Sequence, residues 1–202
     1  MSTPTKAEVV IGVSLPGLRS PGVGFEAPFE MLEACHERVQ RMLDLLNRLR
    51  KHVAKNGCDA QAVDAAVDVM RYFDLAAPLH HQDEELHIFP AAMAMCNDHL
   101  DLLILRLRQE HLRMENLWGE VRQALARVAQ EDANTKSPFS QAELADMDAF
   151  ISIYKDHIRS EEGLVFPEAR RALKPEQMSV ISREMIRRRG GRSKCVNCTG
   201  VV

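Results

Sequence analysis

Two segments of the chain repeat one pattern, a histidine followed four residues later by a glutamate. His80 and Glu84 form the first pair, and His157 and Glu161 form the second, 77 residues further along. A Phe-Pro dipeptide begins five residues after each glutamate. On an α-helix, residues four apart lie on the same face, one turn from each other. Each segment therefore predicts an imidazole and a carboxylate that face the same neighbour.

Two further histidines, His36 and His111, lie on the apolar faces of predicted helices. His36 precedes the first pair by 44 residues and His111 precedes the second by 46, which indicates two similar helical hairpins. Folded face to face, the hairpins would bring four imidazoles and two carboxylates into the interior. Buried carboxylates are costly without cations to compensate them. The set suits two transition-metal ions, with Glu84 and Glu161 as bridges and the imidazoles as terminal ligands.

The repeat also separates ligands from their histidine neighbours. His81 and His87 have no counterpart in the second copy, where Ile158 and Leu164 stand, so neither is predicted to bind metal. His87 lies seven residues after His80 and so on the same helix face, which keeps a metal contact from His87 as an alternative.

The duplicated acidic residues Glu85 and Glu162 lie about 140° around an ideal helix from their paired histidines. They are expected to point away from the metal, toward arginines near the site or on the surface. Tyr154, three residues before a histidine, is interpreted as core, with a contact near the metal as the alternative. Cys35 is interpreted as a small buried hydrophobe. A metal-free interaction bundle, in which the pairs are ordinary salt bridges, is a further alternative.

Apolar residues at three- and four-residue steps predict four long helices that position these side chains. The first runs from Pro28 to a stop at Asn56-Gly57, and the second from a cap at Asp59 through the first pair, with a kink expected at Pro78. The third opens at 97–98 and fades at 131–134, and the fourth follows a capping-box pattern at 140–143. Short connections predict an all-α, up-down-up-down four-helix bundle over residues 27–173.

The remaining segments flank this bundle. Residues 1–26, rich in Pro and Gly, are expected to form an extended N-terminal arm. Residues 174–202 are expected to form a short helix and a flexible basic tail, with the arginines at 187–189 at a solvated helix end. Cys195 and Cys198 form an isolated Cys-x-x-Cys pair, too few ligands for a structural zinc site.

Composition excludes several classes of function. A chain of 202 residues with 46% hydrophobic residues favours one domain with a sizeable core. The formal charge of −3 gives no indication of nucleic-acid binding, and no apolar run is long enough for a membrane span. Five scattered cysteines are not a disulfide framework. We therefore expect a cytoplasmic protein with neither nucleic acid nor membrane as a partner.

Over residues 28–172 the chain resembles the hemerythrin-like family of cation-binding proteins, also called the HHE domain. The resemblance rests on the two His-x-x-x-Glu segments, the two single histidines and the trailing Phe-Pro pairs. It implies a four-helix bundle holding two non-haem iron ions joined by an oxo or hydroxo bridge. It also implies terminal ligands and bridging carboxylates at the following positions: His36, His80, His111 and His157 as terminal ligands, Glu84 and Glu161 as bridges.

One position departs from the oxygen-carrying members of that family, which have His-x-x-x-His on the third helix. Here Glu115 follows His111 at that spacing, as an additional metal ligand or as a residue beside the site. The departure argues against simple reversible oxygen carriage. We expect a di-iron protein that reacts with or senses oxygen, peroxide or nitric oxide, with a redox partner protein. No residue is assigned a catalytic role, and the alternatives are a peroxide- or nitric-oxide-consuming oxidoreductase and iron storage or delivery for iron-centre repair.

Overall fold

The computed structural model describes residues 27–130 and 139–190, in which all regular structure is helical. The predicted arm at 1–26 and the tail beyond 190 lie outside the described residues. The helical segments have the following bounds: α1 (Pro28–Asn56), α2 (Ala60–Asp83), η1 (Glu84–Ile88), α3 (Phe89–Met93), α4 (Asp98–Gln130), α5 (Gln141–Ser160), η2 (Glu161–Val165), α6 (Phe166–Ala172) and α7 (Pro175–Arg188).

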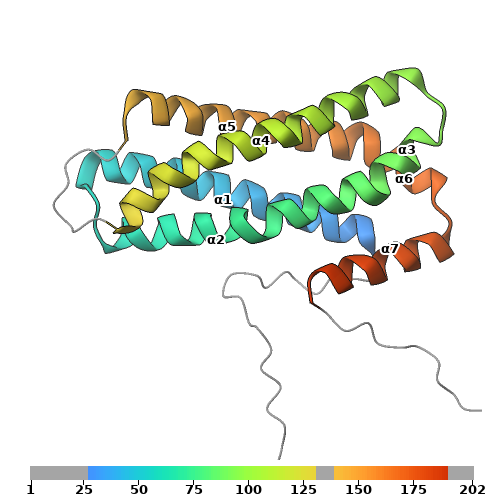
Figure 1. The fold of residues 1–202 in the computed structure, drawn as a ribbon, viewed down its shortest axis with the longest axis horizontal. Helices are drawn as coiled ribbons and strands as arrows, with labels where there is room; N and C mark the ends of the chain where they lie inside the picture. The colour runs from blue at the N-terminus through green and yellow to red at the C-terminus, as the bar shows by residue number, and fades with distance from the viewer. Residues whose placement is uncertain (1–26, 131–138, 191–202) are drawn as a thin grey trace, which may run out of the picture.

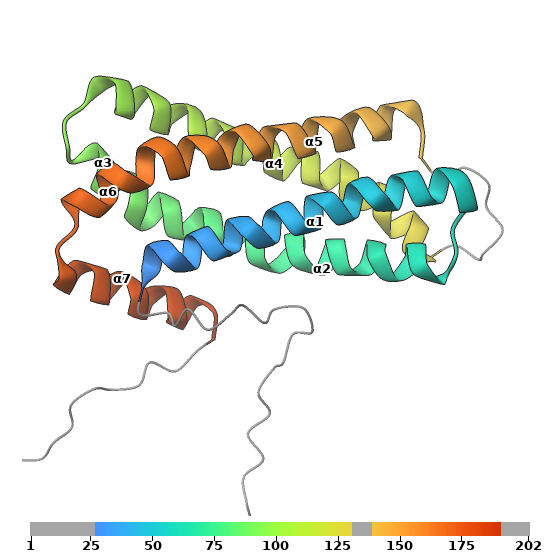
Figure 2. The same ribbon diagram turned by 180° about the vertical axis from the view of Figure 1, so that it is seen from behind.

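The four long helices form an antiparallel bundle (Figures 1 and 2). Helix α1 packs against α2 and α5, and α4 packs against the same two helices. The short helices α3 and α6 meet at one end of the bundle, where α7 lies beside α1. The predicted all-α, up-down-up-down four-helix bundle with a short C-terminal helix is therefore confirmed. Across the described residues, no helix combines the length and the apolar character needed to span a membrane.

Local signals in the sequence account for the helix ends. The Asp59 side chain accepts a hydrogen bond from the backbone N–H of Ala62 at 2.9 Å and caps α2. Ser140 and Glu143 form a reciprocal capping box at the start of α5. Gly57 ends α1 with a φ of 81°, a conformation that glycine adopts without steric cost.

Each Phe-Pro dipeptide follows a π-helical turn, η1 before Pro90 and η2 before Pro167. Proline has no N–H, and its ring crowds the carbonyl of the residue four before it. In both turns the phenylalanine N–H therefore bonds to the carbonyl five residues back, at Glu84 and at Glu161. By contrast, Pro78 does not interrupt α2, which continues through this residue to Asp83.

The core consists of two apolar clusters with the histidine-rich segment between them. One cluster fills the long part of the bundle and includes Phe73 and Phe150. The other lies at the end formed by α3, α6 and α7, and includes Phe89 and Phe166. The rings of Phe89 and Phe166 stack on His111 and His36 at centroid distances of 5.6 and 5.5 Å. Polar side chains between the clusters are thus shielded from water on both sides.

Helix α7 is attached to the bundle through Asp83, a completely buried carboxylate beside Glu84. Arg188 Nη2 lies 2.5 Å from Asp83 Oδ1, and Arg189 Nη1 lies 2.6 Å from Oδ2. The solvated helix end expected for these two arginines is therefore wrong. A buried carboxylate requires charge partners, and α7 supplies them from a segment 105 residues away in sequence.

Candidate metal centre

Six of the predicted ligands meet in the middle of the bundle. Four helices and the two π-helical turns supply them, and each of the six residues is at most 4% exposed: His36, His80, Glu84, His111, His157 and Glu161. In each His-x-x-x-Glu pair, the histidine lies in the last turn of an α-helix and the glutamate begins the π-helical turn that follows. The spacing of four residues therefore brings the two side chains of a pair together within one segment. The single histidines reach the same place from α1 and α4.

The six side chains form two overlapping groups of four. Within each group, the ligand atoms lie within 4.8 Å of one another. The first metal position is defined by His36 and His80, and the second by His111 and His157, while Glu84 and Glu161 belong to both. At the second position the two histidine Nε2 atoms are only 3.0 Å apart. Imidazole nitrogens that converge in this way face a common point.

The carboxylates divide their oxygens between the two positions. Glu84 Oε1 lies 3.1 Å from His80 Nε2, and its Oε2 lies 3.6 Å from His111 Nε2. Glu161 Oε1 lies 3.0 Å from His157 Nε2, and its Oε2 lies 3.3 Å from His36 Nε2. Each position thus has two nitrogens and two oxygens, one from each carboxylate. This is the arrangement that two bridging carboxylates give to a metal pair.

Hydrogen bonding does not account for these buried atoms. All four oxygens of Glu84 and Glu161, and Nε2 of His36, are buried and have no hydrogen-bond partner among the described residues. Leaving several such groups unsatisfied is strongly destabilising unless something compensates them. Imidazole and carboxylate ligands suit divalent transition ions, so the residues present fit a two-metal centre.

Hydrogen bonds that Nδ1–H donates to carboxylates orient three of the four histidines. His36 Nδ1 lies 2.9 Å from Glu162, and His111 Nδ1 lies 2.8 Å from Glu85, so each duplicated acidic residue reaches the opposite hairpin. His157 Nδ1 lies 2.9 Å from Glu110. A carboxylate that accepts from Nδ1–H presents Nε2 to the metal and raises its basicity.

The fourth histidine differs from the other three. Within residues 27–130 and 139–190, His80 Nδ1 has no hydrogen-bond partner, and the group beside its ring is the thiol of Cys35. Cys35 is buried, as predicted. Cys35 directly precedes His36, and Glu110 directly precedes His111. A comparison of the two helices that carry a single histidine could therefore have identified Cys35 and Glu110 as equivalent residues beside the site. The repeated His-x-x-x-Glu segments alone do not reveal Glu110.

Without metal, protonated histidines compensate the negative charge of the buried glutamates. Burial lowers the pKa of His80 and of His157, but the carboxylates of Glu84 and Glu161 outweigh this and raise both values to about 9. The pKa of His36 is likewise raised well above its usual value, against burial, by contacts with the glutamates. Metal uptake must therefore displace protons.

The other candidates lie elsewhere. Glu115 belongs to neither group; its exposed side chain lines a neighbouring cavity instead. His87 Nε2 lies 2.8 Å from Arg188 Nη2 and 3.4 Å from Glu184 Oε2. His81 is not a member of either group, but its ring stacks on His111 with centroids 4.0 Å apart. The repeat alone did not predict this contact of His81 with a candidate ligand, because Ile158 takes the place of His81 in the second copy.

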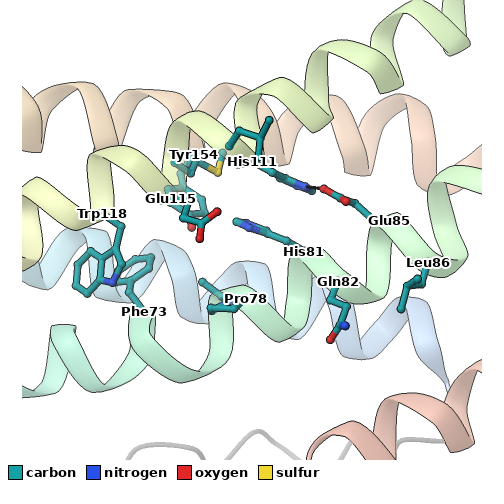
Figure 3. A pocket seen from close by; sticks show the side chains of 13 residues that line it. Phe73, Pro78, His81, Gln82, Glu85, Leu86, His111, Glu115, Trp118 and Tyr154 are labelled. Carbon is teal, nitrogen blue, oxygen red and sulfur yellow. Dashed lines mark hydrogen bonds and ion pairs between the residues drawn. The ribbon is translucent and has the colours of Figure 1, made fainter.

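The cavity opens beside the second metal position (Figure 3). Its volume is about 600 Å³. Among the six clustered ligands it touches only His111, and Tyr154 also lines it. Tyr154 is buried within the core, as predicted, and burial raises the pKa of its phenol, so the group stays neutral. The two metal positions therefore have different surroundings.

Comparisons with known proteins agree with this geometry. A family model described as the hemerythrin HHE cation binding domain matches residues 27–169. An uncharacterized protein from Haemophilus influenzae is 29% identical over 162 residues, which cover 80% of this chain and 90% of that protein. The matched range contains all six clustered ligands and both Phe-Pro dipeptides.

Proposed function

This chain belongs to the hemerythrin HHE cation-binding family, and from that premise we propose that its centre holds two non-haem iron ions. The observation that carries the proposal is the division of Glu84 and Glu161, with one oxygen of each at either position. The ions would be joined by these carboxylates and by an oxo or hydroxo group. The four clustered histidines would be their terminal ligands.

We further propose that the centre reacts with or senses oxygen, peroxide or nitric oxide. A pair of bridged iron ions supplies one-electron chemistry and open coordination positions for such small ligands. The protein's own groups orient the histidines through Glu85, Glu110 and Glu162 and exclude water with stacked phenylalanines. We place the protein in the cytoplasm, where a redox partner protein would reduce the oxidised centre.

A second candidate function is an oxidoreductase that consumes peroxide or nitric oxide. The cavity beside His111 favours it, because it gives access to one metal position from outside. Repeated turnover with an electron donor would support the enzyme, and uptake of one ligand per centre would support the sensor. Iron storage or delivery predicts instead that iron passes readily to an acceptor protein.

The first test is metal analysis of the purified protein, with absorption spectra of the reduced form before and after exposure to air. We expect two irons per chain and ligand-to-iron charge-transfer bands that appear on oxidation. Absence of iron after anaerobic reconstitution, or a single zinc ion, would contradict the proposal.

A further inference from the structure

The cavity beside the second metal position is far larger than a diatomic gas or peroxide requires. Its volume of about 600 Å³ lies within the range of sites that bind small organic molecules. Its walls come from α2, η1, α4 and α5, all of them helical parts of the bundle. The cavity thus has the size and the preformed shape of an organic ligand site.

Its walls are mainly apolar. Phe73 and Trp118 lie with their rings 5.0 Å apart at one end, where Figure 3 shows them together. Leu86 and Leu112 line the cavity although they are 52% and 55% exposed. Exposed leucines beside a cavity offer apolar surface that an organic ligand would cover.

The polar groups of the cavity are few and are not all satisfied. His81 Nε2 is buried, and no residue in the described part of the chain forms a hydrogen bond with it. Figure 3 shows the His81 ring extending toward the Glu115 side chain. A few convergent polar groups in an apolar cavity are the usual means of orienting a ligand.

The charges at the cavity have one sign. Glu85 and Glu115 line it, and none of the described residues that line it is a lysine or an arginine. Glu85 is partly engaged with His111, so the exposed Glu115 is the carboxylate more available to a ligand. The face of an indole ring such as that of Trp118 also attracts cations. Both features favour a positively charged ligand.

The second copy of the repeat does not reproduce the α2 side chains that line this cavity. At the offset of 77 residues, Ile158 replaces His81, Arg159 replaces Gln82 and Lys155 replaces Pro78. The two basic residues would reverse the charge, and isoleucine removes the polar ring. The chemical character that α2 gives to the cavity is therefore not repeated at the equivalent positions of α5, although the candidate metal ligands are repeated.

We propose that this cavity binds a small organic amine with an apolar, preferably aromatic, body. The body would lie against Phe73 and Trp118, and the protonated amine would lie near Glu115. The binding site is a feature of the folded chain and does not rest on the proposed iron chemistry. Its failure and the failure of the iron proposal are therefore separable.

The chain contains one tryptophan, Trp118, which makes its fluorescence a direct reporter of the cavity. The purified protein would be titrated with three probes of similar size: 2-phenylethylamine, 2-phenylethanol and phenylacetate. We expect a saturable change of emission with the amine, which should bind about fivefold more tightly than the alcohol, as one surface-exposed charge contact allows. Phenylacetate should bind most weakly. Saturation-transfer NMR of the probes provides a second measure of binding.

Glu115→Gln, with Glu120→Gln as its matched control, tests the role assigned to the carboxylate. Both residues are exposed on α4, but only Glu115 lines the cavity. We expect Glu115→Gln to abolish the preference for the amine over the alcohol and Glu120→Gln to preserve it. Equal losses in the two variants would overturn the proposal. So would equal binding of the three probes, or the absence of both emission change and saturation transfer with all of them.

Discussion

The two metal positions are built from the same repeated ligands but are supported differently. At the second position, Glu85 accepts a hydrogen bond from Nδ1 of His111, and Glu110 accepts one from Nδ1 of His157. At the first, Glu162 holds His36, whereas His80 has only the Cys35 thiol beside it. The duplication thus preserves the metal ligands more strictly than their supporting residues.

This difference has consequences for metal affinity and access. A carboxylate partner raises the basicity of an imidazole ligand and restricts its orientation, and a thiol does so only weakly. We therefore expect the second position to hold its ion more tightly. The second position is also the one beside the cavity, so strong retention and access from outside coincide there.

The largest effect is expected where the two positions share a ligand. Glu161→Ala removes one oxygen from each, so both ions should be lost and the melting temperature should fall with the iron content. Iron analysis and thermal unfolding measure this. Glu37→Ala is the control, since its exposed carboxylate follows His36 but points outward. Unaltered iron content in Glu161→Ala would contradict the bridging assignment.

A pH dependence of the metal-free protein should be next in size. His80 and His157, one at each position, have pKa values raised from 6.5 to about 9. The stability that their protonation contributes is fully present below pH 6.5 and is lost as the pH rises through about 9, a loss of about 3 kcal/mol for each histidine.

Thermal unfolding of metal-free and iron-loaded protein between pH 6 and pH 9.5 would measure this loss. The iron-loaded protein should not show it, because metal ions rather than protons compensate the carboxylates. A metal-free melting temperature that stays constant over this range would exclude charged imidazoles at these positions.

A smaller effect is expected from the residues that support the histidines. Glu110→Ala should weaken binding of one ion by about 10- to 100-fold, because His157 loses its carboxylate partner. Cys35→Ala should change iron retention little. The rate of iron loss to a chelator, with one iron per chain leaving early from Glu110→Ala, measures the difference. Equal rates in the two variants would mean that the two positions are equivalent in this respect.

The smallest effect on metal content is expected at Glu115. Its side chain is exposed at the cavity and lies in neither ligand group. Glu115→Ala should therefore retain two irons per chain and an unchanged melting temperature. Loss of one iron from this variant would show that Glu115 reaches the second position when metal is bound.

Much of the fold and the ligand set follows from local patterns. The caps at Asp59 and Ser140 depend on residues within three positions of each other. The pairing of His80 with Glu84 depends on one helical turn. Repetition of that pair, with a single histidine on each preceding helix, indicated which side chains face inward. Short-range periodicity is enough for inferences of this kind.

Other features depend on how distant segments meet. The ideal helical period turns Glu162 away from the centre, yet its carboxylate reaches His36 across 126 residues of sequence. The contact of Asp83 with α7 joins residues 105 apart. The stacking of His81 on His111 and the cavity beside them are further contacts between different helices. None of these has a signature within a single helix.

The sequence by itself therefore determined the helices, their inward faces and the six side chains that could bind two metal ions. Only the tertiary structure decided which carboxylate supports which histidine, that Glu115 lines a cavity, and that the cavity opens at one metal position. The physical reason is that helical periodicity determines the direction of a side chain from its own axis. Its partner depends on the rotation and offset of the packed helices, which the whole core determines.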